Sequence, residues 1–245
     1  LYATCAGVAE IAADRIAAIN AVDPMITVAT VPNLHRVDAG TMIATIKIIS
    51  YAVPRQALES ACAVSHHALC VLVPAFSLAT LIETEVGDDV PSPKGRAAMI
   101  ARTERLGLVM SDRVIVPHDS SAIADAIRQA PGDILFILTA SATSDPRDVA
   151  PEALRAAGGR VEAYGMPVDP GNLLFFGDVR GKPVIGLPGC ARSPALNGAD
   201  WVLERLICGV ALTQADISAM GVGGLLKEIP TRPRPRASGG GQDGA

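Results

Sequence analysis

A short loop rich in small hydroxyl residues is the first candidate for chemistry in this sequence. It follows an apolar strand expected over residues 133–138 and leads into a helix that begins near Pro151. Its hydroxyl side chains belong to Thr139, Ser141, Thr143 and Ser144. Hydroxyl groups and free backbone N–H groups at a helix N-terminus can together hold a phosphate. The same residues could instead do no more than cap the helix, and the local pattern leaves both interpretations open.

Two loops rich in glycine and proline flank one expected β-hairpin further along the chain. The first loop covers residues 165–172 and the second covers residues 186–192. Tight turns of this kind let the backbone approach a ligand closely. A single hairpin rarely needs two rigid loops at its base, so the pair favours a binding function.

Polar residues also follow two other expected strands. Asp88, Asp89 and Lys94 come after a strand at 78–82, and Pro117-His118-Asp119 ends a second strand. In an open parallel sheet, ligands bind beyond the carboxyl ends of the strands. We therefore expect these loops at the same edge as the hydroxyl loop. The adjacent histidines His66-His67 have no third metal ligand nearby and indicate a solvated turn instead.

Alternating strands and helices from residue 78 onward predict a three-layer α/β/α domain with a mainly parallel sheet. The expected strands cover 78–82, 108–116, 133–138, 161–163, 173–176 and 183–185. The expected helices cover 96–105, a segment around Ile123–Ile127, a segment from Pro151 to Gly158, and 197–208. Before them, a helix over 5–20, strands at 26–29 and 42–49, and a helix from Pro54 are expected.

These elements predict three parts in the chain. Residues 1–75 are expected to form a small α+β N-terminal subdomain, and residues 76–209 the α/β domain. Residues 210–245 are expected to be an extension that ends in a disordered linker, because 230–245 is rich in proline and arginine and then in glycine. The sequence begins at Leu1 and not at methionine. We expect it to be a piece of a longer protein.

The composition limits the classes of function. Of 245 residues, 49% are hydrophobic, 19% are charged and 3% are aromatic, with a formal net charge of −4. Such a chain can bury a large aliphatic core, and it is a poor candidate for broad nucleic-acid binding. The apolar stretch 68–82 is interrupted by Pro74 and is shorter than the roughly 20 residues that a membrane span needs. Five cysteines without zinc-like spacing fit a reducing, cytoplasmic location.

Four motifs in order resemble those of the molybdopterin-binding domains of molybdenum cofactor biosynthesis. Residues 139–152 are similar to the family's signature loop, with Asp148 at its acidic position. Asp169-Pro170-Gly171 and Gly186-Leu187-Pro188-Gly189 look like two later loops, and Pro117-His118-Asp119 sits where the family has acidic residues. The resemblance covers about 78–209. It is closest to bacterial proteins in which this domain precedes a nucleotidyltransferase-like domain that cytidylylates the cofactor.

The resemblance implies a trimer-forming domain that binds molybdopterin or the molybdenum cofactor, often with Mg²⁺ and a nucleotide such as ATP or CTP. It implies that Asp148 acts at a metal-bound phosphate, as catalytic residue and metal ligand, with Asp119 as a second catalytic carboxylate. The phosphate side would be formed by Thr139, Ala140, Ser141, Thr143 and Ser144. The pterin side would be formed by Pro170, Gly171, Asn172, Gly186, Pro188, Gly189 and Arg192.

Several positions depart from the family pattern. Ala140-Ser141 replaces a Gly-Gly pair, His118 replaces an acidic residue, and Asn172 replaces a lysine. Cys190 replaces an asparagine, and its thiol could serve as a soft metal ligand or have a purely structural role. Losing a carboxylate and a cation weakens a phosphoryl-transfer site. The departures therefore favour retained binding over full adenylyl transfer.

Three hypotheses for the function follow. In the first, the domain binds molybdopterin and presents it to a nucleotidyltransferase domain on the full chain. In the second, it is an active Mg²⁺-dependent molybdopterin adenylyltransferase or a molybdate-inserting transferase. In the third, it is a non-catalytic oligomerisation scaffold. None of the three gives it a nucleic-acid or membrane partner.

Overall fold

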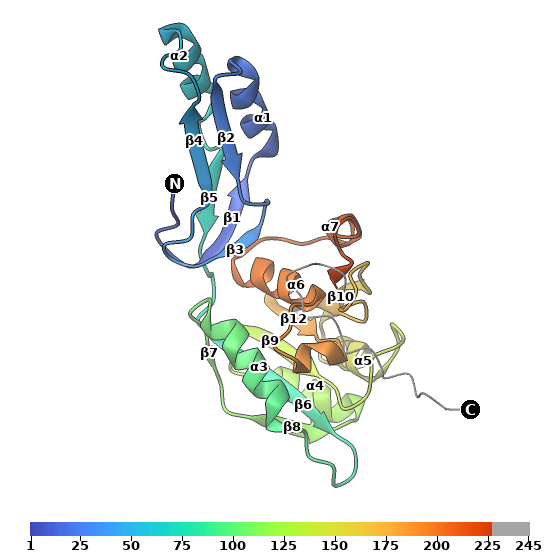
Figure 1. Ribbon diagram of the computed structural model, residues 1–245. Coiled ribbons are helices and arrows are strands. Elements are labelled where there is room, and N and C mark those ends of the chain that lie inside the picture. The colour runs from blue at the N-terminus through green and yellow to red at the C-terminus, as the bar shows by residue number, and fades with distance from the viewer. Residues whose placement is uncertain (227–245) are drawn as a thin grey trace, which may run out of the picture.

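A seven-stranded sheet forms the centre of the larger part of the molecule (Figure 1). The computed structural model describes residues 1–226, so the linker expected over 230–245 lies outside the described residues. The strand order is β10-β11-β12-β9-β6-β7, and β8 also pairs with β6. The strands are β6 (Leu78–Glu85), β7 (Val109–Met110), β8 (Val114–Pro117), β9 (Ile134–Leu138), β10 (Arg160–Tyr164), β11 (Phe175–Val179) and β12 (Lys182–Gly186). Only β11 runs against the other six, which confirms the predicted mainly parallel sheet.

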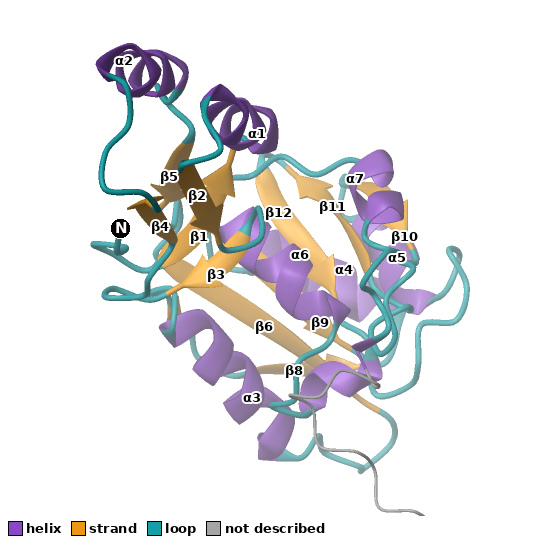
Figure 2. Cartoon of the chain, turned by 45° about the horizontal axis from the view of Figure 1, so that its top comes forward, coloured by secondary structure: helices purple, strands orange, loops and turns teal. Residues whose placement is uncertain are grey.

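Helices cover both faces of this sheet, as Figure 2 shows. Strand β9 is apolar throughout, because Ile134 and Phe136 pack into one core while Leu135 and Ile137 pack into the other. The helices are α3 (Pro93–Glu104), α4 (Ser120–Gln129), α5 (Val149–Ala156), α6 (Gly198–Ile207) and the short α7 (Gln214–Ala219), with a 3₁₀ turn η1 (Gly189–Arg192). Helices α3 and α6 share the first core, and α4 and α5 share the second. The three-layer prediction is confirmed.

Buried polar contacts fix α3 against α6 and against the loop between them. Arg102 is 7% exposed, and its Nε donates to Asp200 Oδ1 at 2.6 Å. Its Nη1 donates to Ala191 O at 2.9 Å and its Nη2 to Ser193 O at 2.7 Å. The second Asp200 oxygen accepts from the backbone N–H of Asn197 at 2.8 Å and closes a capping box at the start of α6. The loop after β12 is thus fixed at Ala191, Ser193 and Asn197.

The N-terminal elements form an arm, residues 1–72, that extends from the body in Figure 1. Strands β1 (Gly7–Ile11), β3 (His35–Val37) and β5 (Leu69–Leu72) form one small sheet in the order β3-β1-β5. Strands β2 (Ile26–Thr30) and β4 (Ala44–Ile48) form a two-stranded sheet, and α1 (Ala13–Val22) and α2 (Arg55–Val64) complete the arm.

Two predicted elements differ from the observed ones. The helix expected over 5–20 is wrong in its first half, because Gly7–Ile11 is a strand that pairs on both sides with β3 and β5. Its apolar residues suit a central strand as well as a helix face, and sheet pairing decides between them. The strand expected over 108–116 is two strands, β7 and β8, interrupted at residues 111–113.

The apolar stretch around Pro74 forms β5 and the start of β6, as expected. In the described part of the chain, no helix combines the length and apolar character needed to cross a membrane.

One ion pair joins the arm to the body. Arg36 Nε of β3 lies 3.5 Å from Glu204 Oε1 of α6. Burial, and next the nearby Asp200 carboxylate, raise the pKa of Glu204 from its ordinary value of 4.5 to about 7. The Arg36, Arg105 and Arg205 guanidinium groups oppose this rise without cancelling it. Near neutral pH, Glu204 is therefore only partly ionised at the junction.

We expect the stability of the protein to fall as pH rises from about 4.5 to about 7, because the unfolded state releases the Glu204 proton first. The contribution of this group is on the order of 3 kcal/mol at most and is constant above the folded-state pKa. Urea unfolding at several pH values measures it. The variant Glu204→Gln should lose this part of the pH dependence, and an unchanged pH profile would contradict the account.

Two glycines close together in sequence have opposite surroundings. A Cβ added at Gly186, at the end of β12, would lie 1.8 Å from Cε1 of the Phe175 ring on β11. A Cβ added at Gly189 would have no heavy atom within 4 Å. Gly186 is therefore required by packing between neighbouring strands.

We expect Gly186→Ala to lower the free energy of unfolding by about 1–3 kcal/mol, since Phe175 must move from its packed position. The matched variant Gly189→Ala should change it by less than about 0.5 kcal/mol. Urea denaturation of both variants measures the difference. Equal losses of unfolding free energy in the two variants would show that contact with the Phe175 ring does not exclude a side chain at residue 186.

Candidate functional site

The predicted loops meet at one edge of the sheet. Strands β6, β8, β9 and β12 are parallel, so the segments that follow them start at the same edge. The antiparallel pairing of Phe175 with Gly186 brings the loop before β11 to this edge as well. The structure thus gathers His118, loop 139–148, loop 165–174 and loop 187–197 there.

A chain of hydrogen bonds connects three of these segments. The Thr84 hydroxyl, fully buried near the end of β6, lies 3.0 Å from Nδ1 of His118. The other ring nitrogen of His118, Nε2, lies 2.9 Å from Ser141 Oγ. Thr84 Oγ1 also accepts the backbone N–H of Ala140 at 2.7 Å. The Thr84–His118–Ser141 relay therefore links the inside of the sheet to an exposed hydroxyl.

The acceptors available to the Thr84 hydroxyl determine which atoms of this relay donate and which accept. Among the described residues, His118 Nδ1 is the one acceptor within reach of the buried Thr84 hydroxyl proton. A buried hydroxyl that fails to donate costs free energy, so we assign Nδ1 as acceptor and place the ring proton on Nε2. Nε2–H then donates to Ser141 Oγ. The Ser141 hydroxyl proton is left to point outward, where it can donate to a ligand.

The other hydroxyls of loop 139–148 divide into internal and external ones. Thr139 and Thr143 are 5% and 7% exposed. The Thr139 hydroxyl donates to Ser141 O at 2.6 Å, and Tyr164 donates to Thr143 O at 3.0 Å. Ala140, Ser141 and Ser144 are exposed. The two threonines shape the loop, and its ligand-facing surface comes from the exposed residues.

Arg192 joins this loop to the loop after β12. Its Nη2 donates to Thr139 O at 2.7 Å. A Cβ added at Gly95, in the first turn of α3, would lie 3.3 Å from Arg192 Cγ. The absence of a side chain at Gly95 thus leaves room for the arginine. Arg192, predicted from the sequence to lie on the pterin side, thus carries its positive charge beside the hydroxyl loop.

The two carboxylates predicted to be catalytic both cap helices. Asp148 Oδ1 accepts from Val149 N at 2.8 Å, and its Oδ2 accepts from Ser144 N at 3.1 Å. Asp119 Oδ1 accepts from both the hydroxyl and the backbone N–H of Ser121, at the start of α4. The Ser121 hydroxyl bond, followed by the backbone bonds, lowers the pKa of Asp119. Each carboxylate already accepts hydrogen bonds from backbone N–H groups at the N-terminus of a helix. Asp148 therefore occupies the N-terminus of α5, where a phosphate was expected.

Most residues predicted on the pterin side have packing roles. Gly171 has a φ of +138°, and a Cβ there would lie 2.6 Å from Gly198 N at the start of α6. The Pro170 carbonyl accepts from that same N–H at 2.8 Å. Gly186 and Pro188 are buried, whereas Asn172 and Gly189 are exposed. Asn172, Gly189 and the half-buried Arg192 are the predicted residues best placed to contact a ligand.

The sequence reasoning missed two residues of this site. Thr84 lies beyond the strand expected over 78–82, whereas β6 continues to Glu85 and buries it. His118 was treated as a departure from a motif, and it is the centre of the relay. Within residues 1–226, no group of three or more His, Cys, Asp or Glu side chains is arranged to hold a metal ion.

Comparison with known proteins relates part of the chain to a described family. Residues 93–207 match the model of a family described as a probable molybdopterin binding domain. A solved structure, a molybdopterin biosynthesis MoeA protein from Pyrococcus horikosii, is 16% identical, with a TM-score of 0.39, over 88% of this chain and 68% of that one. No curated protein sequence matches the chain. The matched segment, residues 93–207, contains the hydroxyl loop and Arg192.

Proposed function

We propose that the protein binds molybdopterin, or the molybdenum cofactor, at the carboxyl edge of the sheet and presents it for nucleotidyl transfer. The observation that carries this proposal is the relay that ends in an outward-pointing Ser141 hydroxyl. Molybdopterin carries a phosphate monoester, which needs hydrogen-bond donors and positive charge. Ser141 supplies the donor, and the Arg192 guanidinium beside Thr139 supplies the charge.

The geometry favours one position for the phosphate within the loop. The Asp148 carboxylate takes the N–H groups of Ser144 and Val149 at the start of α5. A second anion at that helix terminus would be repelled by this carboxylate. We therefore place the phosphate nearer to Ser141 and Arg192 than to α5. The pterin ring would then extend toward Asn172 and Gly189, which are exposed at the same edge.

The helix-capping roles of Asp119 and Asp148 favour binding and presentation of the cofactor over catalysis. Asp119 and Asp148 both use oxygen atoms to cap helices, and neither carboxylate is held apart from the backbone for phosphoryl transfer. We propose that ATP or CTP, with its Mg²⁺, is bound by a partner nucleotidyltransferase and not by these residues. Asp148 remains the residue best placed to contact a Mg²⁺ ion that arrives with the phosphate.

The remaining parts of the chain have supporting roles in this proposal. We assign residues 1–75 to positioning the domain, residues 76–209 to cofactor binding, and residues 210–245 to a C-terminal extension. Assembly into a homotrimer, as the family resemblance suggests, would present several cofactor sites together.

Anaerobic calorimetry with molybdopterin tests the relay. We expect Ser141→Ala to weaken binding by about 10- to 100-fold, since a hydrogen bond to a charged group contributes about 1.5–3 kcal/mol. His118→Asn keeps an acceptor for Thr84 and removes the donor to Ser141, so it should weaken binding to a similar extent. His118→Gln keeps a donor near the Nε2 position and should bind more tightly than His118→Asn.

The control variant is Ser218→Ala, which removes an exposed hydroxyl on α7 and should leave the affinity unchanged. Thermal unfolding of each variant separates a binding defect from misfolding. Absence of saturable binding to the unmodified protein would refute the proposed function. Unchanged affinity in both Ser141→Ala and His118→Asn would refute the relay as its basis.

A further inference from the structure

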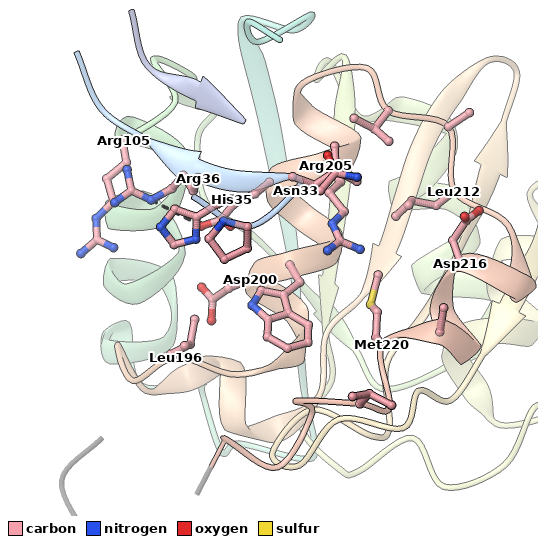
Figure 3. Close-up of a pocket in the computed structure, with 18 of the residues that line it drawn as sticks. Asn33, His35, Arg36, Arg105, Leu196, Asp200, Arg205, Leu212, Asp216 and Met220 are labelled. Atoms are coloured by element: carbon pink, nitrogen blue, oxygen red, sulfur yellow. Dashed lines mark ion pairs between the residues drawn. The ribbon is translucent and has the colours of Figure 1, made fainter. Parts of the chain in front are cut away.

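A cavity of about 670 Å³ lies where the arm meets the body (Figure 3). Its walls are α6, α7, residues 32–36 of the arm, Arg105 at the end of α3, residues 210–212, and Pro194 and Leu196 of loop 187–197. None of the residues of loop 139–148 lines it. Its volume lies within the range of about 300–1,000 Å³ that is typical of small-molecule sites. The cavity is thus a second candidate site, separate from the one proposed for molybdopterin.

The acidic side chains in the cavity wall already have partners. Asp200 accepts from Arg102, and Glu204 lies 3.5 Å from Arg36. Asp216 accepts from the Thr213 hydroxyl at 2.6 Å and from the Thr213 N–H at 2.8 Å. These acceptors are therefore engaged within the protein and have little capacity left for a ligand.

Several donors in the same wall have no partner in the described part of the chain. Arg205 Nε is buried and lacks an acceptor. Arg105 and Arg205 form no ion pair within 4.0 Å and no hydrogen bond among residues 1–226, and the Trp201 indole N–H has no acceptor there either. Figure 3 shows the Arg205 side chain directed into the cavity between Asp200 and Met220. Arg105 is exposed to solvent, and the Glu204 and Asp216 carboxylates attract Arg205, so the buried Arg205 Nε is the donor that an acceptor on a ligand would satisfy.

Apart from these charged groups and the polar side chains of Asn33 and His35, much of the lining is apolar. Leu34, Leu196, Leu212 and Met220 come from four different segments and surround the same space, together with the Trp201 ring. A hydrated inorganic ion would leave this apolar surface in contact with water. An organic body would bury it, and a ring could stack on Trp201.

From the unpaired donors and the apolar lining we infer that this cavity binds a small organic oxyanion. The negatively charged group lies against the Arg205 guanidinium, and the body lies between Trp201 and the aliphatic side chains. Arg105 adds positive charge at the α3 end of the cavity. A carboxylate and a phosphate ester share this chemistry, and binding experiments can separate them.

Trp201 is the single tryptophan of the chain, so its fluorescence reports directly on the cavity. Benzoate and phenyl phosphate serve as anionic probes, and benzamide serves as the neutral analogue, with excitation at the red edge of the tryptophan band. We expect a saturable change in emission with at least one anion. Benzamide should bind about tenfold more weakly, and the tighter anion shows whether the site prefers a carboxylate or a phosphate.

The variant Arg205→Gln should weaken binding of the anion by about tenfold and leave benzamide binding unchanged. Arg205→Lys keeps the charge and should give an intermediate affinity. Arg128→Gln is the matched control, because Arg128 lies on α4 and pairs with Asp125 outside the cavity. Three outcomes overturn the inference: no saturable response to either anion, equal affinity for the tighter anion and benzamide, or an Arg205→Gln variant that binds that anion as before.

Discussion

The buried guanidinium of Arg102 is the interaction on which the arrangement of the site depends. Its donors reach the Asp200 carboxylate and the carbonyl groups of Ala98, Ala191, Ser193 and Ala195. A buried charge is tolerated only when it is paired and hydrogen-bonded, so these segments must converge on it. The convergence fixes the loop after β12 between α3 and α6. Arg192, in the same loop, is thereby held within reach of Thr139.

The second constraint is the direction of the strands. Parallel strands put the loops after β6, β8, β9 and β12 at one edge, and the Thr84–His118–Ser141 relay makes contact across three of them. The buried end of the relay fixes the tautomer of His118, and the exposed end offers a donor. In the proposed site, the residues that face the ligand also hold the fold together. Asp119 and Asp148, which cap α4 and α5, have such structural roles as well.

The sequence was sufficient for the features that depend on local patterns. The all-apolar strand at 134–138 and the Gly/Pro loops around the hairpin are visible in it because spacing and residue type determine them. Features that depend on distant contacts were missed. Gly7–Ile11 is a strand because β3 and β5 flank it, and Thr84, Arg102 and the cavity at α6 acquire their roles from segments far away in the chain.

Amide hydrogen exchange with and without molybdopterin tests the central claim most directly, because it locates the ligand on the whole chain. Binding at the carboxyl edge predicts slower exchange in residues 139–144 and 186–192, with little change on the exposed faces of α6 and α7. Protection confined to the cavity between α6, α7 and the arm, or no protection in either loop, would contradict the claim.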